Sequence, residues 1–195
     1  MTGLLAIIAG LGLSAAAGFR VFIPLFVLSL AGHSDAIQLN DSFQWLQSGP
    51  ITIVLGTATV VEIASYYIPW VDNMLDTIAT PASLIAGTVI SASVMPEMDP
   101  GMKWALSIII GGGSAGIVQA GTVLTRSAST ATTGGIGNPV VSTVEAGSAI
   151  TLSVLAIVIP VLIGILALCL VIMLGRRLYR HYRNKRTPGP GKAVA

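Results

Sequence analysis

Residues 62–81 read EIASYYIPWVDNMLDTIATP and hold three of the eight acidic residues of an otherwise apolar chain. Glu62 belongs to an apolar segment, whereas Asp72 and Asp76 are spaced one helical turn apart and share a face if residues 70–79 are helical. A charged side chain at membrane depth costs about 2.5–3.5 kcal/mol on insertion scales, so it usually faces a protein interior or a water-filled cavity. This stretch therefore predicts a polar site inside a bundle of membrane helices.

The composition of the chain is that of a membrane protein. Its 195 residues are 53% hydrophobic and only 9% charged, whereas soluble domains carry about 25% charged residues. Seven of the ten Lys and Arg residues lie at or beyond residue 176, and this excess beside the last apolar run places the C-terminus in the cytoplasm. We therefore expect an all-α, polytopic domain over residues 1–178 and a basic cytoplasmic tail over residues 179–195 that is partly disordered.

The first apolar run, residues 4–30, is long enough to cross a bilayer but is interrupted by Gly18, Arg20 and Pro24. Proline lacks an N–H group and collides with the carbonyl four residues back, so the break is expected at Arg20. Discontinuous helices with a charge at the break form binding sites in transporters. The alternative is a helix that starts later or tilts, from which Arg20 reaches the headgroups. No basic segment precedes the run, which favours a retained span over a signal peptide.

Proline after a capping residue marks the expected starts of the later helices. Thr80-Pro81, Asp99-Pro100 and Asn138-Pro139 follow this pattern, and Gly49-Pro50 is a weaker case. They divide the chain into residues 50–68, 81–95, 100–124 and 139–178. The second of these segments would be only about 22 Å long, so it is expected to be re-entrant or to combine with residues 70–79. The prediction is four or five spans plus one or two short or re-entrant helices, with a weak internal repeat.

Two polar features in the second half have alternative interpretations. Residues 126–138, RSASTATTGGIGN, form a predicted connection whose hydroxyls and backbone N–H groups suit an anion, although a plain loop has the same composition. The residues proposed for this anion loop are Thr132, Thr133, Gly134, Gly135 and Asn138. Glu145 either belongs to the polar site or completes a capping box that begins at Ser142.

Several long strings resemble a known family. They are GLSAAAGFRVFIPL from residue 12, VEIASYYIPWVDNMLDTIATP from residue 61, AGT from residue 86, GGGSAG from residue 111 and RSASTATTGGIGNPVVSTVE from residue 126. Together they resemble the bacterial membrane family named for domain of unknown function 4126, over roughly residues 4–160. The resemblance implies a small multi-pass protein of the bacterial inner membrane and no known substrate. It also implies that the family signature includes Arg20, Glu62, Asp72, Asp76, Arg126 and residues 132–139.

The charges support two functional hypotheses. In the first, a transporter or channel moves an ion or small solute, with Glu62, Asp72 and Asp76 binding a cation or proton. Arg20 and Arg126 then neutralise the carboxylates or hold an anionic group, and Glu145 is a further candidate. In the second, a non-transporting subunit or scaffold uses the same charges as structural ion pairs. Charges converging on a cavity favour the first hypothesis, and tight pairs without a cavity favour the second.

An enzyme is not expected, because an aspartyl mechanism needs two carboxylates opposed from separate segments, whereas Asp72 and Asp76 are neighbours on one turn. The sequence predicts no cofactor and leaves a metal open. The expected partners are the lipid bilayer, with anionic headgroups at residues 176–186, an unidentified ion or solute, and a second copy of the chain in a homo-oligomer. Nucleic acid is not expected, because the basic tail directly follows a membrane span.

Overall fold

The computed structural model describes the backbone of residues 3–68 and 71–186, and all regular structure in these residues is helical. A short 3-10 helix, η1 (Asp41–Gln47), and a π-helical turn, η2 (Ile108–Gly112), accompany the α-helices. The α-helices are α1 (Gly3–Ala17), α2 (Phe22–His33), α3 (Gly49–Ser65), α4 (Val71–Val94), α5 (Pro100–Ser107), α6 (Gly113–Thr133), α7 (Asn138–Val158) and α8 (Pro160–Arg186). The predicted all-α fold is confirmed.

Four continuous helical segments are long and apolar enough to cross a membrane. They are Met74–Val94, Pro100–Thr133, Asn138–Val158 and Pro160–His181. A fifth span is possible if η1 and α3, which meet at a bend of 63°, are counted together. The protein therefore has the four or five candidate spans that the sequence predicts, and it is a multi-pass membrane protein.

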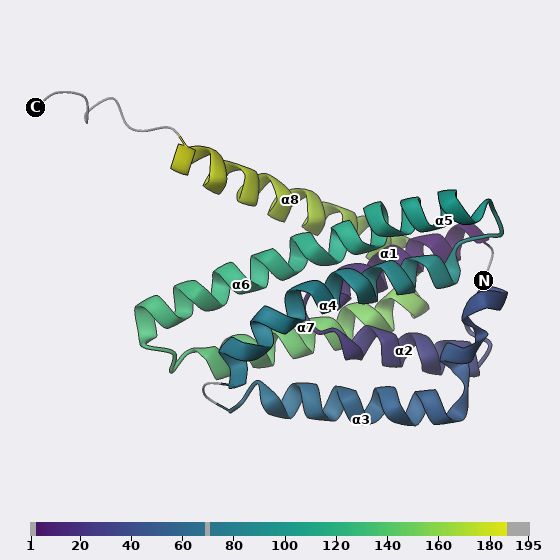
Figure 1. Ribbon diagram of the computed structural model, residues 1–195, viewed down its shortest axis with the longest axis horizontal. Helices are drawn as coiled ribbons and strands as arrows, with labels where there is room; N and C mark the ends of the chain where they lie inside the picture. The colour runs from purple at the N-terminus through teal and green to yellow at the C-terminus, as the bar shows by residue number, and fades with distance from the viewer. Residues whose placement is uncertain (1–2, 69–70, 187–195) are drawn as a thin grey trace, which may run out of the picture.

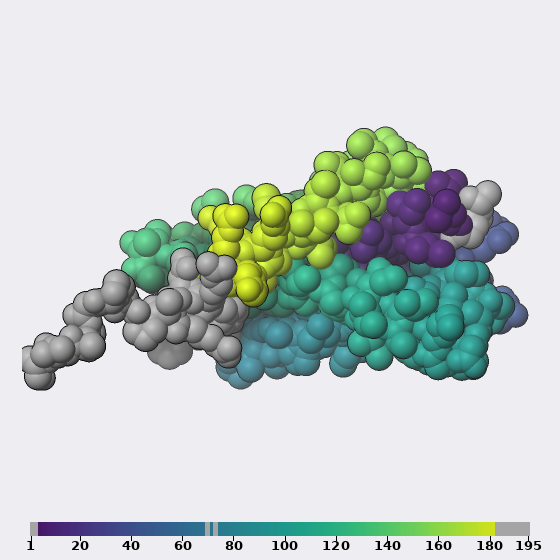
Figure 2. All heavy atoms as spheres, turned by 90° about the horizontal axis from the view of Figure 1, so that it is seen from above, coloured from purple at the N-terminus to yellow at the C-terminus, as the bar shows by residue number. Residues whose placement is uncertain are grey.

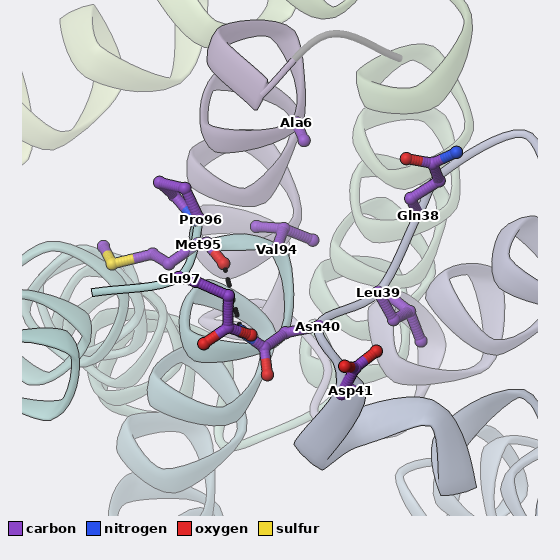
Figure 3. A pocket seen from close by; sticks show the side chains of 9 residues that line it. All are labelled: Ala6, Gln38, Leu39, Asn40, Asp41, Val94, Met95, Pro96 and Glu97. Carbon is purple, nitrogen blue, oxygen red and sulfur yellow. Dashed lines mark hydrogen bonds between the residues drawn. The ribbon is translucent and has the colours of Figure 1, made fainter. Parts of the chain in front are cut away.

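The first two helices form a hairpin that enters the bundle and returns. With 15 and 12 residues, α1 and α2 are about 22 and 18 Å long, too short to cross a hydrocarbon core of about 30 Å. Figure 3 shows that Ala6 of α1 and Leu39, beyond α2, border the same hollow beside Val94. The tip of the hairpin lies beside the middle of the α5–α6 segment. A Cβ atom on Gly18, at the tip, would overlap the side chain of Val118, which is near the centre of that segment. The two helices therefore form a short hairpin beside the longer candidate spans (Figure 1), which is the geometry expected of a re-entrant element.

This hairpin is also the core of the protein. α1 packs against α4, α6, α7 and α8, and α2 packs against α3 and α7. Many of its small and aliphatic side chains have no accessible surface, among them Ala9, Leu13, Ala15, Ala16, Ala17 and Leu28. Seen from above, the start of α1 is flanked by α8 on one side and by the α5 region on the other (Figure 2). The surrounding spans thus shield a pair of helices that cannot cross the membrane by themselves.

The break between α1 and α2 includes Arg20, as the sequence predicts, but the helix start expected at Pro81 is wrong. Helix α4 continues from Val71 to Val94 with Pro81 inside it. Proline there removes one N–H group from the helical ladder. The hydroxyl of Thr80 donates to the carbonyl of Asp76 at 3.0 Å, which adds a hydrogen bond in the turn before the proline. Residues 71–80 and 81–94 are therefore one continuous helix, which confirms the alternative that the short segment combines with the residues before it.

The connection expected over residues 126–138 is mostly helical. Helix α6 ends only at Thr133, and Gly134, with a φ of 64°, terminates it in the left-handed conformation. Hydroxyl side chains in the last turns donate to carbonyls four residues earlier, as Ser127 does to Val123 at 2.8 Å and Thr132 to Ala128 at 2.8 Å. These local bonds allow a Ser/Thr-rich sequence to remain helical.

The segment expected over residues 139–178, whose apolar run at residues 149–174 predicts one span kinked at Pro160, is instead two helices. Helix α7 ends at Val158, and Pro160 begins α8, which turns back along the bundle (Figure 1). A Cβ on Gly164 would meet Ile8 of α1, and Gly175 lies against Ile117 of α6. The tail expected from residue 179 starts as a continuation of α8 to Arg186, and residues 187–195 lie outside the described part of the chain.

A glycine contact holds α4 against the π-helical turn, and its loss should destabilise the bundle. A Cβ on Gly87 would lie 2.5 Å from the carbonyl oxygen of Gly111, and the Ser14 hydroxyl donates to the Gly87 carbonyl at 2.9 Å. We expect Gly87→Leu to lower the free energy of unfolding by about 1–3 kcal/mol through overpacking, measured by denaturant titration in detergent. Gly147→Leu is the control, because a Cβ at Gly147 meets nothing within 4 Å. Equal stability of the two variants would contradict the close approach.

Candidate functional site

Glu62 of α3 holds the tip of the hairpin. Its two carboxylate oxygens accept hydrogen bonds from the backbone N–H groups of Val21, at 2.7 Å, and Phe22, at 3.0 Å. These residues begin α2, whose first N–H groups have no partner within the helix and carry a partial positive charge. The carboxylate of Glu62 therefore acts as both hydrogen-bond acceptor and counter-charge for the N-terminus of α2.

Arg20 lies at the break and is only 2% exposed, so it does not reach out to headgroups. Its Nη2 donates to the carbonyl of Ser142 at 3.2 Å and lies 3.3 Å from Oε2 of Glu145. Its guanidinium also stacks on the ring of Tyr66, with Cζ 3.6 Å from the ring centroid. The Nε atom is buried and has no hydrogen-bond partner within the described residues. The hairpin tip is thus fixed to both α3 and α7.

Arg126 of α6 completes the cluster from the opposite side. Its Nε donates to both carboxylate oxygens of Glu145, at 3.2 and 3.1 Å, and its Nη2 forms a further short bond to Glu145. Nη2 also donates to the hydroxyl of Ser142 at 3.2 Å, and Nη1 lies 3.5 Å from Oδ1 of Asp76. The guanidinium carbon lies 4.2 Å from the centroid of Tyr66. Charge-assisted bonds of this geometry are the strong ones in proteins.

Two guanidinium groups and three carboxylates therefore meet at the hairpin tip, and we call these residues with Tyr66 and Ser142 the tip cluster. Burying a charge costs several kcal/mol, which ion pairing and hydrogen bonds must offset. Stacking of a desolvated cation on an aromatic ring adds about 2 kcal/mol. The Asp76 side chain is the most open carboxylate of the three, at 18% exposed against 6% for Glu145. The cluster is thus closed on the α7 side and partly open at α4.

The tip cluster brings together most of the predicted site residues: Arg20, Glu62, Asp76, Arg126 and Glu145. Asp72 lies one turn before Asp76 in α4, and its side chain is outside the described part of the structure. The capping-box interpretation of Glu145 is wrong, because α7 already starts at Asn138 and Glu145 lies buried in its interior.

The residues proposed for the anion loop lie elsewhere, in the last turn of α6 and the turn into α7. They are Thr132, Thr133, Gly134, Gly135 and Asn138. The hydroxyl of Thr133 accepts a hydrogen bond from the N–H of Gly137 at 3.0 Å, and Thr130 bonds to Asn138. These contacts close the turn itself. Anion binding there stays a prediction.

Sequence reasoning missed Tyr66 and Ser142 as members of the site. Tyr66 lies within the acidic stretch, but a tyrosine beside apolar residues is equally typical of a membrane interface. Ser142 was assigned to a helix start, although its hydroxyl and carbonyl both serve the arginines. Their roles depend on which helices adjoin, and the spacing along the chain carries no signal for that.

Two hollows lie near the ends of the hairpin. One, of about 240 Å³, lies between α2, α3 and α4, and Glu62 and Tyr66 form part of its wall. The other, of about 250 Å³, lies at the opposite end of the hairpin, where Asn40 donates to Glu97 at 2.6 Å (Figure 3). Only the first borders the tip cluster.

Removal of the central carboxylate should destabilise the fold strongly. In Glu145→Gln the two buried guanidiniums lose their shared counter-charge, and breaking a buried pair costs about 3–5 kcal/mol. The free energy of unfolding in detergent measures this loss. Asp35→Asn, at an exposed loop position, is the matched control and should be neutral. A Glu145→Gln protein as stable as this control would mean that the observed ion pairs contribute nothing to folding.

Removal of the Glu62 carboxylate should loosen the hairpin tip selectively. In Glu62→Ala the N–H groups of Val21 and Phe22 lose their acceptors, and an unsatisfied buried donor costs about 1–3 kcal/mol. Hydrogen exchange should accelerate at residues 19–24 and stay unchanged at residues 86–92 of α4. Glu62→Gln retains one acceptor oxygen and should give an intermediate rate. Unchanged exchange at the tip in Glu62→Ala would show that the carboxylate does not cap α2 in solution.

Comparison with known proteins agrees with the sequence resemblance. Residues 7–180 match the family described as "Domain of unknown function (DUF4126)". None of the curated proteins or solved structures matches the chain. The matched region contains the complete hairpin tip and every residue of the tip cluster. Because the match extends over most of the chain, this multi-pass membrane protein belongs to the family of domain of unknown function 4126.

Proposed function

We propose that the protein is a small secondary carrier or channel that moves an ion or small solute past the tip cluster. The observation that supports this most directly is the re-entrant hairpin, whose tip places a helix N-terminus and Arg20 against Glu62 and Glu145. Discontinuous helices whose ends meet charged groups inside the membrane build the sites of many transporters.

The depth of the tip cluster suits a site near one membrane face. Glu145 is thirteen residues from Val158 along α7, about 20 Å at 1.5 Å per residue. The first basic residue of α8, Arg176, is sixteen residues from Pro160, about 24 Å. Both lengths are measured from the end of the bundle where α7 meets α8. The cluster therefore lies slightly closer to the membrane centre than the basic end of α8 does. Positive charge marks the cytoplasmic face, so we place the site near the cytoplasmic boundary of the inner membrane, with the exposed Arg176, Arg177 and Arg180 at anionic headgroups.

Among the carboxylates, Asp76 is the best candidate for contact with a transported cation or proton. It is the most exposed of the three described carboxylates and faces Arg126 at 3.5 Å, longer than the bonds of Glu145 to the same arginine. An ion that approaches the cluster therefore reaches the carboxylate of Asp76 more readily than that of Glu145, which is buried under several hydrogen bonds from Arg126. Asp72, one turn away on the same helix, would supply a second carboxylate.

A non-transporting scaffold is the second candidate, and one observation favours it. Arg126 binds Glu145 through two nitrogens, and each oxygen of Glu62 accepts a hydrogen bond from a backbone N–H group. Buried pairs of this kind can define a helix arrangement without any chemistry. The scaffold hypothesis therefore requires that no ion or solute binds at Asp76.

Ligand-dependent stability separates the two functions. We would measure the thermal unfolding of the purified protein in detergent across pH and with sodium, potassium, magnesium, chloride and phosphate. A ligand at about a hundred times its dissociation constant stabilises the folded state by about 2.7 kcal/mol. Transport predicts such a stabilisation by one of these solutes or by protons, and loss of that response in Asp72→Asn/Asp76→Asn. The control Asp35→Asn/Asp41→Asn, at the opposite end of the hairpin, should keep it.

Flux in vesicles then tests transport itself. The ion found in the stability measurement is placed inside proteoliposomes, and its release is followed with an ion-selective dye under a potassium diffusion potential. Transport predicts release above that of empty vesicles, lost in the Asp72→Asn/Asp76→Asn variant. A flat stability profile together with an unfolded double variant would reject transport and favour the scaffold.

A further inference from the structure

The hollow beside the tip cluster is an apolar pocket that opens sideways between two membrane spans. It has a volume of about 240 Å³ and is walled mainly by aliphatic side chains of α3 and α4, such as Ala58, Val61, Leu75 and Ile78. Val61 and Ile78 are more than half exposed on the outer surface of these spans. The mouth of the pocket therefore lies on a surface that the bilayer covers.

The chemistry of the wall favours hydrocarbon over water, because most of the lining is apolar. A buried water needs two to four polar partners, and apolar cavities of about 150 Å³ stay dry and bind small hydrocarbons. This pocket is larger than such a cavity. Both oxygens of Glu62, its most polar lining residue, already accept hydrogen bonds from Val21 and Phe22. Hydrocarbon is the occupant that matches both the wall and the surroundings.

The position of α3 explains why this pocket exists. α3 packs mainly on α2 and η1 and is separated from α4 by the pocket. The lining residues of α3 run from Ala58 to Tyr66, which is about 14–26 Å from the start of the helix at Gly49. This depth is the half of the membrane on the side of the basic α8 end. A chain from the lipids of that leaflet reaches the pocket without crossing the bilayer centre.

The inner end of the pocket is amphipathic. Tyr66 presents one part of its ring to the pocket wall and lies against both guanidiniums, 3.6 Å from Arg20 and 4.2 Å from Arg126. An occupant of the pocket therefore touches the residue on which both arginines stack. No other described residue belongs to the pocket wall and also contacts both arginines.

We propose that this pocket is a lipid site that holds one hydrocarbon chain of a phospholipid, inserted sideways between α3 and α4 from the leaflet facing the basic end of α8. The site shares Glu62 and Tyr66 with the tip cluster, but lipid binding there does not depend on transport. It connects the tip cluster to the lipid phase through Tyr66 and Glu62. The bound chain fills a space that the protein leaves open.

Photolabelling tests the site with a defined lipid. The full-length protein is reconstituted in vesicles of phosphatidylethanolamine and phosphatidylglycerol that contain phosphatidylcholine with a diazirine in one acyl chain. After illumination, adducts are mapped by mass spectrometry. Ala58→Trp fills the pocket from α3, and Ala64→Trp, at an exposed position of the same helix that does not line the pocket, is the matched control.

We expect adducts on residues 75–82 of α4 in the wild type and in Ala64→Trp, and about tenfold fewer in Ala58→Trp, equivalent to 1.4 kcal/mol of binding. Adducts on α8 residues 161–168 should be equal in all three proteins. Equal α4 labelling in Ala58→Trp would overturn the proposal. If Ala58→Trp does not give a monodisperse protein, Ala58→Leu replaces it, with a smaller decrease expected and no decrease counting against the site.

The outcome is separable from that of the transport experiments. Pocket adducts in a protein without ion response or flux would reject transport and leave the lipid site standing. Ion flux in a protein without pocket adducts would reject the lipid site alone.

Discussion

The burial of Arg20 is the constraint on which the rest of the structure depends. The hairpin tip puts this guanidinium among apolar helices, where an uncompensated charge costs several kcal/mol. Glu145 of α7, the ring of Tyr66 and the carbonyl of Ser142 surround it. Glu145 in turn requires Arg126, and the new helix start beside Arg20 requires Glu62. Five helices therefore converge on the tip because each charge needs the next one.

The sequence predicted which charged residues belong to the cluster better than it predicted which residues they contact. Arg20 was placed at a helix break because proline geometry is local, and Glu62 was singled out because charge is rare in apolar segments. Contacts between helices depend on which helices pack together. The sequence around Tyr66 therefore did not indicate that its ring contacts the two arginines. The predicted helix start at Pro81 was wrong. A proline that follows a capping residue is typical of a helix start, but Pro81 lies inside α4. The reversal at Pro160 was read as a kink because the apolar run continues on both sides.

The tip cluster has a rigid side and an open side, and this difference bears on its function. Glu145 is held by Arg126 through several hydrogen bonds and by Arg20 at 3.3 Å. Asp76 makes a longer contact with Arg126 and keeps part of its surface exposed. A site that binds and releases a ligand needs an exchangeable member on a fixed frame. In the proposed carrier, α6 and α7 would provide the frame and Asp76 of α4 would be the carboxylate that a ligand reaches.

Glu62 joins two features that would otherwise be independent. Its carboxylate caps the first turn of α2, and its side chain also forms part of the wall between α3 and α4. Tyr66, at the end of the same helix, also lines this space and lies against both guanidiniums. α3 packs mainly on α2 and η1, so the wall of the pocket and the cap of the hairpin tip belong to a single helix.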